Sequence, residues 1–231
     1  MGPAAAKVTP FAARAVPEVA FGPGRAREIG TDAAVLGDPA RPIVLVTDAA
    51  LVDLGLTREI ARALESAGAE VAVFSDISGE PKQAQVEAAT AFVRSAGAGL
   101  VVCLGGGSAM DVGKIAATLA LADAGPADFA MEGRPLPKRS IPMICIPTTA
   151  GTGSEFSSTN IFTNEGGRKV WIWGAETKPD RVILDPELSV SLPATLTAWT
   201  GLDAFAHALE ASTNCRRHAW NDLYAHAALA L

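Results

Sequence analysis

The sequence has few cysteines, few aromatic residues and no excess of basic charge, and each shortage excludes a class of protein. Its three cysteines stand far apart among 231 residues, without the spacing of a zinc site or a disulfide framework, which fits a reducing cytoplasm. A net charge of −6 and the lack of a basic cluster argue against a nucleic-acid partner. No run of about 18 uncharged apolar residues exists, and the N-terminus lacks the apolar core of a signal peptide. The sequence therefore predicts a cytoplasmic protein with no membrane partner.

Apolar residues make up 49% of the chain, and they fall into alternating strand-like and helix-like runs. Residues 1–40, with several Pro and Gly, predict an irregular or edge-strand lead-in. Helices are expected at 57–67, with Thr57 as N-cap, and at 83–95, closed by Gly97. Strands are expected at 43–47, 71–74, 100–104, 141–146, 170–173 and 182–184. This alternation predicts an α/β fold, a parallel sheet with right-handed crossovers and helices on both faces.

The pattern becomes helical after residue 186. Apolar residues recur at helix spacing from Leu196 to Leu209, and a second helix is expected from about Asp222 to the end. The chain ends in an apolar, uncapped stretch, whereas chain ends are usually polar and frayed. We therefore expect an α/β domain at 1–188 and the beginning of an incomplete all-helical domain at 189–231.

The most informative stretch is a strand, three glycines and a helix start. Gly105, Gly106 and Gly107 carry no β-carbon, so a ligand can approach the backbone N–H groups closely. Ser108 is the expected N-cap of a helix that directs its positive end at the turn. Such a turn makes an anion site, most often for a nucleotide phosphate. The alternative is a tight strand-to-helix turn without a ligand, although three adjacent glycines exceed what a plain turn needs.

Two common phosphate motifs do not fit this stretch. The pattern G-x-G-x-x-G starting at Gly105 would need glycine where Met110 stands. A Walker A loop ending at Lys114 would need Ser or Thr where Ile115 stands. A kinase-type P-loop is therefore not indicated.

A second candidate feature is the pair Asp203 and His207, four residues apart on the expected C-terminal helix. A carboxylate and an imidazole at this spacing share one helix face and can hold a divalent metal. Taken alone, the spacing is explained better by a surface Asp–His pair.

Three motifs in series change that balance: Gly105-Gly-Gly-Ser-Ala-Met-Asp, then Pro147-Thr-Thr-Ala-Gly-Thr-Gly-Ser-Glu, then Gly201-Leu-Asp-x-x-x-His. In this order the sequence resembles the iron-containing (group III) alcohol dehydrogenase family, from about Phe21 to the end. The resemblance implies a Rossmann-like dinucleotide-binding domain followed by an all-helical domain, with the active site between them. It also implies a set of cofactor-binding residues, namely Asp48, Gly106, Gly107, Ser108, Asp111, Thr148, Thr149 and Lys169.

Within this set, Asp48 matches the family position beside the adenosine ribose. An acid there accepts a hydrogen bond from a free 2′-OH and repels a 2′-phosphate, which favours NAD over NADP. On spacing alone, Asp48 would be a helix-entry residue, Thr148 and Thr149 a polar turn, and Lys169 a solvated surface charge.

By the same resemblance, Asp203 and His207 are two of four metal ligands, for Fe²⁺ or alternatively Zn²⁺. The other two would be histidines farther along, and this chain ends first. His218 and His226 do not match those positions.

The resemblance implies a reversible, metal-dependent hydride transfer between a small-molecule alcohol (or the corresponding aldehyde or ketone) and NAD, in a homodimer. Alternatives within the same scaffold are enzymes similar to maleylacetate reductase or glycerol dehydrogenase. A different class is a truncated NAD-binding fragment without turnover, or a piece whose exposed helix faces require a partner.

Overall fold

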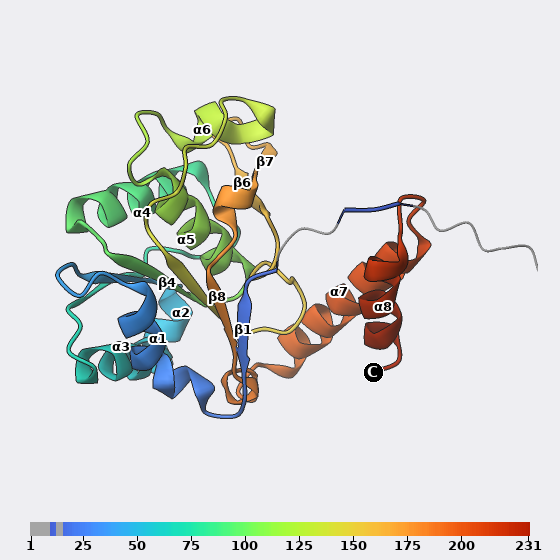
Figure 1. The fold of residues 1–231 in the computed structure, drawn as a ribbon, viewed down its shortest axis with the longest axis horizontal. Helices are drawn as coiled ribbons and strands as arrows, with labels where there is room; N and C mark the ends of the chain where they lie inside the picture. Colours follow the sequence, from blue (N-terminus) through green and yellow to red (C-terminus); the bar gives the residue numbers. More distant parts are fainter. Residues whose placement is uncertain (1–9, 13–15) are drawn as a thin grey trace, which may run out of the picture.

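The computed structural model describes residues 10–12 and 16–231 and has a parallel sheet at its centre (Figure 1). The strand order across this six-stranded sheet is β1-β8-β5-β4-β2-β3, and all five pairings are parallel. The strands are β1 (Glu18–Phe21), β2 (Ile43–Val46), β3 (Val71–Phe74), β4 (Leu100–Gly105), β5 (Met143–Pro147) and β8 (Arg181–Leu184). The central strands β2 and β4 are buried at every position, as expected where both faces of a sheet are covered.

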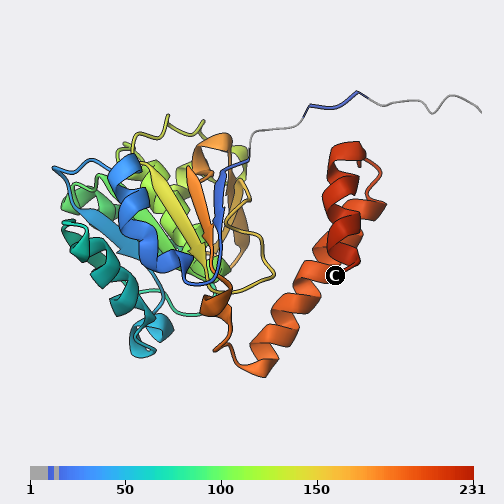
Figure 2. The same ribbon diagram turned by 60° about the horizontal axis from the view of Figure 1, so that its bottom comes forward.

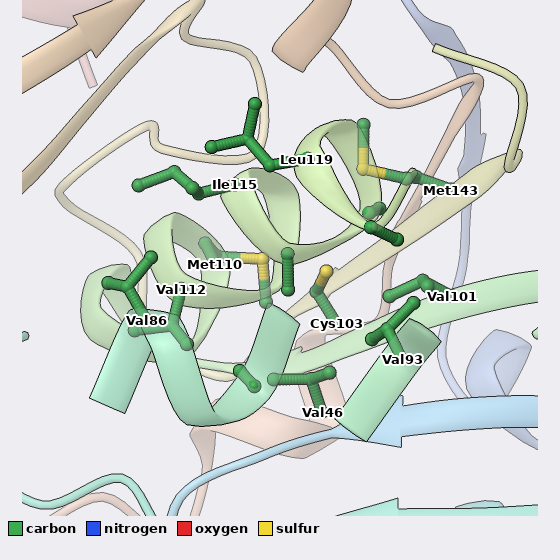
Figure 3. Close-up of a cluster of buried hydrophobic side chains, with 14 of the residues drawn as sticks. Val46, Val86, Val93, Val101, Cys103, Met110, Val112, Ile115, Leu119 and Met143 are labelled. Carbon is green, nitrogen blue, oxygen red and sulfur yellow. The ribbon is translucent and has the colours of Figure 1, made fainter. Parts of the chain in front are cut away.

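Helices cover both faces of the sheet, as the sequence predicts. Side chains of β2 and β4 alternate between two apolar clusters, so that Val46 and Cys103 face one layer while Leu45 and Val102 face the other. The first layer contains α4 (Gln83–Ala96) and α5 (Gly107–Leu119), and the second contains α1 (Ile29–Leu36), α2 (Ala49–Asp53) and α3 (Leu56–Ser66). Figure 3 shows the first cluster, where α5 packs beside α4 and against β4.

The middle of α5 approaches β4 closely. Gly113 lies against the sheet, and a Cβ there would collide with Sγ of Cys103. Cys103 and Cys145 are both buried, in register on neighbouring strands, whereas Cys215 is exposed. This confirms that the two cysteines in apolar runs are core residues.

Two strands form a separate antiparallel hairpin beside α5. These are β6 (Thr159–Thr163) and β7 (Lys169–Trp173), which pair with each other, while Thr163 at the end of β6 also forms an isolated parallel bridge with Lys82. The sequence predicts β7 but not β6, and β7 does not join the parallel sheet. The remaining elements of the α/β body are short. They are α6 (Pro126–Phe129) and the 3-10 helices Arg25–Glu28, Ala130–Glu132, Ala175–Thr177 and Pro186–Ser189.

The C-terminal helices form a pair that stands beside the α/β body (Figure 2). They are α7 (Ala194–Thr213) and α8 (Ala219–Leu229), and α8 begins three residues earlier than the expected 222. Large apolar side chains of this pair are exposed, including those of Trp199, Leu202 and Leu223. Within residues 10–12 and 16–231, none of the helices combines the length and the apolar character that crossing a membrane would require.

Several local expectations need correction. Gly55, not Thr57, precedes the first residue of α3, and Thr57 is buried inside the first helical turn. Gly97 does close α4. The lead-in at 1–40 contains the expected edge strand β1 but also the helix α1, which the sequence analysis does not predict. Part of that lead-in, residues 1–9 and 13–15, lies outside the described residues. The domain boundary at 188 stays a prediction.

Candidate functional site

The candidate site lies where the order of the strands reverses direction. From β2 the chain moves outward to β3, then returns to the other side of β2 as β4 and continues to β5. Ligands of open α/β sheets bind at the carboxyl ends of the strands beside such a reversal. Here the carboxyl ends of β2 and β4 lead into Asp48 and the three glycines.

The glycine turn brings the N-terminus of α5 to this point. Gly105 has φ 145, and a Cβ on it would meet Ala109 Cβ at 2.8 Å and Asp48 Oδ2 at 3.0 Å. Gly106 is the N-cap and Gly107 the first helical residue, so Ser108 lies inside the first turn and is not the N-cap as predicted. The helix starts earlier because glycine accommodates both positions without a side chain. The first N–H groups of α5 have no helical partner and can bind an anion.

Thr148 and Thr149 follow β5 and face the same turn. Thr148 is buried, and its backbone N–H donates to the Gly105 carbonyl oxygen at 2.9 Å. In the described chain, Oγ1 of Thr149 is buried without a hydrogen-bond partner, and it would lie 3.7 Å from a Cβ on Gly106. Buried polar atoms usually have a partner, so this hydroxyl is available for a hydrogen bond to a group bound at the turn.

Asp48 has a structural role that can coexist with a cofactor role. It is the N-cap of α2, and its Oδ1 accepts from the Leu51 backbone N–H at 3.1 Å. Spacing alone favours this helix-entry role. Oδ2 points toward Gly105 and accepts no hydrogen bond from the described residues.

Beside the turn lies a hollow of about 410 Å³, which we call the cleft. Its walls come from α5, the hairpin β6–β7, the segment 152–159 and α7. Of the sequence-predicted residues it brings together Gly107, Ser108, Asp111, Lys169, Asp203 and His207. Asp48, Gly106, Thr148 and Thr149 do not line the cleft, although the glycine turn connects them to it.

Two charged residues of the cleft already have partners inside the protein. Asp111 accepts from the Ser154 hydroxyl and, through Oδ2, from the Ile161 backbone N–H at 2.9 Å. Burial raises the pKa of Asp111 above its usual 3.8, and the charge of Lys114 opposes this effect. Lys169 donates to Oε1 of Glu80 at 2.7 Å, and both side chains are exposed.

Asp203 and His207 on α7 also line the cleft. Oδ1 of Asp203 and Nε2 of His207 are 3.8 Å apart, and both side chains are about half exposed. Nδ1 of His207 lies 3.3 Å from the Gly151 carbonyl oxygen. The tautomer with its proton on Nδ1 can donate there and keep Nε2 available as a ligand.

These two donors suit a divalent metal in type and position. Carboxylate oxygen and imidazole nitrogen are ligands for Fe²⁺ and Zn²⁺, and here they project together into a solvent-accessible cleft. Among the residues that the structure describes, no third His, Cys, Asp or Glu completes a metal-binding group with them. Two such donors alone do not form a complete metal-binding group.

Sequence reasoning missed Glu80, Lys114 and Ser154. Glu80 lies 89 residues from Lys169, and no motif in the sequence around Glu80 indicates a functional residue. Lys114 could have been found, since a lone charge between apolar residues on a helix indicates a buried, satisfied group. Its Nζ donates to two backbone carbonyls, and burial lowers its pKa from the usual 10.5.

The fold and the site together define an α/β protein with a glycine turn and a helix N-terminus at the reversal point of a parallel sheet. The chain belongs to the iron-containing alcohol dehydrogenase family, whose model matches residues 17–186. This confirms the resemblance drawn from the three motifs.

Individual relatives agree with this assignment. The chain is 39% identical over 194 residues to long-chain-alcohol dehydrogenase 1 of Geobacillus thermodenitrificans (strain NG80-2), covering 83% of this chain and 49% of that protein. It is 35% identical over 196 residues to the NAD-dependent methanol dehydrogenase of Bacillus methanolicus, covering 84% and 51%. The chain thus spans about half the length of the curated relatives it matches.

Solved structures give the same fold. The sulfoacetaldehyde reductase of Bifidobacterium kashiwanohense, crystallised in complex with NAD+, superposes with a TM-score of 0.81 at 37% identity. The match covers 88% of this chain and 54% of that one. A 1,3-propanediol oxidoreductase gives a TM-score of 0.82 at 33% identity, covering 91% and 55%.

Proposed function

We propose that the chain binds NAD and contributes to a metal-assisted, reversible hydride transfer between a small-molecule alcohol and NAD. The observation that carries the proposal is the meeting of the α5 N-terminus with the unpartnered Thr149 hydroxyl at the β2–β4 reversal point. The cleft next to it holds Asp203 and His207, so a phosphate site and a metal pair adjoin. The names of the relatives support the same chemistry.

The cofactor set is that implied by the resemblance. Gly106, Gly107 and Ser108 donate backbone N–H groups to the pyrophosphate, helped by the positive end of α5. Oδ2 of Asp48 accepts from the ribose 2′-OH, which favours NAD over NADP. The Thr149 hydroxyl gains its missing partner from the cofactor.

Three further members of the set act nearby. Thr148 supports the turn through its backbone bond to Gly105. Lys169 would exchange its contact with Glu80 for one to the cofactor, at little cost, since an exposed ion pair contributes only about 0.2–1 kcal/mol. Asp111 acts through its hydrogen bonds to the cleft wall.

Asp203 and His207 would hold Fe²⁺, or alternatively Zn²⁺. When bound, the metal supplies a Lewis acid that lowers the pKa of the alcohol, and NAD supplies the hydride acceptor. The chain's own share is to orient these groups: His207 is held by Gly151, and the cleft places the pair opposite the start of α5.

Calorimetry with NAD+ and with Fe²⁺, alongside an alcohol-dependent NADH assay, tests the proposal on this 231-residue chain. We expect saturable NAD+ binding and competition by ADP-ribose. No heat from NAD+ at millimolar concentration would contradict the cofactor site.

A second candidate is NAD binding by these 231 residues without turnover. It is favoured by the two-donor metal group and by the match to about half of each relative. NAD+ binding with no NADH formed at saturating Fe²⁺ would select it, whereas turnover would reject it.

A homodimer is proposed as well, paired through β1. This strand is the outer edge of the sheet on that side, and its Val19 and Phe21 side chains are exposed. Open edge strands are templates for pairing with another chain.

A further inference from the structure

Lys114 is among the largest fully buried side chains of the described protein, and it lies in the middle of α5. Its Nζ donates to the carbonyl oxygens of Ser154 at 2.6 Å and Ser157 at 2.9 Å. It makes no ion pair within the described residues. Burying a charged amine costs free energy that backbone acceptors only partly offset, so an apolar side chain would suit a purely structural position better.

Asp111 acts on the same segment from one turn earlier on the helix. It accepts from the hydroxyl of Ser154 and from the backbone N–H of Ile161. Two side chains of α5 therefore hold the segment 152–161 at three positions. These are Ser154, Ser157 and, within β6, Ile161.

This segment needs anchors from outside because it has little regular structure of its own. Between Gly153 and Thr159 its internal backbone hydrogen bonds are those of Phe156 and Ser157 to the Gly153 carbonyl oxygen. It is irregular over residues 151–158, so its shape is set by what it packs against.

The same segment forms one wall of the cleft and contacts both of its ends. Thr152 lies against the glycine turn, with Cγ2 at 3.1 Å from a Cβ on Gly107. The adjoining Gly151 is packed against the backbone of Thr200 on α7 and accepts from His207. A shift of the segment would therefore move the wall between the phosphate turn and the metal pair.

We infer that Lys114 and Asp111 are positioning residues: they fix the segment 152–161 to α5 and thereby shape the cleft, whose lining includes Asp111 but not Lys114. The part of this inference that concerns cofactor binding rests on the proposed function. The part that concerns the segment does not.

Amide hydrogen exchange of the ligand-free chain tests the segment directly. In Lys114→Met we expect exchange at Phe156, Ser157 and Ile161 to be about tenfold faster than in the wild type, with the amides of β4 unchanged. The matched control is Thr118→Val, which removes a buried hydroxyl one turn farther along α5; this hydroxyl donates to the backbone carbonyls of Lys114 at 2.8 Å and Glu176 at 3.2 Å and not to the segment 152–161. This control should leave the three amides at the wild-type rate.

Unchanged exchange at the three amides in Lys114→Met would overturn the inference, and so would equal acceleration throughout the α/β body. If Lys114→Met does not fold, Asp111→Asn, Ser154→Ala and their double variant replace it. Coupling between the two changes in a double-mutant cycle at the Ile161 amide supports the anchor, and additivity overturns it.

Calorimetry with NAD+ provides the readout for the cleft. Lys114→Met should raise the dissociation constant for NAD+ about threefold to tenfold, whereas Thr118→Val should not change it. If the wild type itself does not bind NAD+, the proposed function fails while the exchange data still decide the role of Lys114. Wild-type affinity in a Lys114→Met protein with a loosened segment would overturn the link to the cleft.

Discussion

At the scale of single residues, the candidate site depends on the absence of side chains at three glycines as much as on functional groups. Gly105, Gly106 and Gly107 leave space that Asp48, Thr149 and Thr152 border at 3.0–3.7 Å from the positions of absent β-carbons. A ligand phosphate would take that space, so side chains introduced there compete with it directly.

Gly107→Val should weaken NAD+ binding by about 100-fold or more, equivalent to ~2.7 kcal/mol, because its side chain would occupy the phosphate position and press on Thr152. Gly166→Val, in the exposed turn of the β6–β7 hairpin, is the matched control. Calorimetric titration measures both. Equal affinity of Gly107→Val and the wild type would remove the turn from the cofactor site.

Asp48→Ser should raise the ratio of NADP+ to NAD+ affinity about tenfold, because the repulsion of a 2′-phosphate is lost. Serine is chosen because it can still cap α2, as Asp48 does through Leu51. A ratio that stays constant, measured by fluorescence titration with both cofactors, would count against a ribose contact.

The buried amine of Lys114 predicts a pH dependence of stability. Its pKa is lowered by burial from the usual 10.5, while Asp111, Glu155 and the thiols Cys145 and Cys103 face it and favour its charge. Between its folded pKa and 10.5 the unfolded chain binds more protons than the folded chain, so the free energy of unfolding rises with pH.

Lys114→Met lacks this contribution. The stability of the wild type minus that of Lys114→Met should therefore increase as the pH is raised from neutral toward 10.5, in urea unfolding followed by circular dichroism. Taking this difference cancels the titrating groups that do not interact with Lys114. If this difference in stability falls as the pH rises, burial does not disfavour the charged form of the Lys114 amine.

At the scale of elements, strands were easier to predict than the contacts between them. The predicted boundaries of β2 to β5 and β8 agree to within two residues because each is an apolar run bounded by turn residues. The strand β6 escaped prediction since its buried side chains include Asn160, which a hydrophobic pattern counts as polar. The helix α1 lies in a stretch with Pro and Gly that suggests irregular structure.

The candidate site divides in the same way. The resemblance implied Asp48, the glycines and Thr148–Thr149, and their cofactor role stays a prediction. Their common location follows from the fold, because each lies at the carboxyl end of a strand and parallel strands bring these ends to one edge. The anchors Lys114–Ser154 and Glu80–Lys169 could not be predicted, since they join residues 40 and 89 apart whose meeting depends on how the hairpin packs.

The edge strand β1 carries a prediction about association. The N–H groups of Glu18 and Gly22 bond to β8, so by alternation those of Val19 and Phe21 face the open edge. Val19→Pro should therefore convert the proposed dimer to a monomer without loss of the fold, since proline removes only an outward donor.

Sedimentation velocity measures the outcome. The control, Ala20→Pro, removes a donor to β8 and should lower stability instead. A wild-type chain that is monomeric at all accessible concentrations would contradict pairing through β1.

The helix α7 carries the metal prediction. His207→Ala should lower the iron retained per chain after desalting by about tenfold or more, since one of the two donors is removed. His226→Ala on α8 is the control because it is remote in sequence and does not line the cleft. Equal iron content in both variants, measured by elemental analysis, would count against the assignment.

At the scale of the whole molecule, the α/β body and the helix pair differ in how they are stabilised. The body encloses two apolar clusters, one on each face of the sheet. In contrast, the side chains of Trp199, Leu202 and Phe205 on α7 are more than half exposed. The phosphate part of the site belongs to the body alone, and the metal part depends on α7. Cofactor binding and metal binding can therefore fail separately.

The distribution of the three cysteines has a practical use. Cys103 and Cys145 lie inside the sheet, and burial raises the pKa of the Cys145 thiol well above its usual 9.0, whereas Cys215 is exposed between α7 and α8. A maleimide dye applied to the folded wild-type chain would thus attach at one place. A fluorophore or spin label can therefore be attached to the helix pair without introducing a new cysteine.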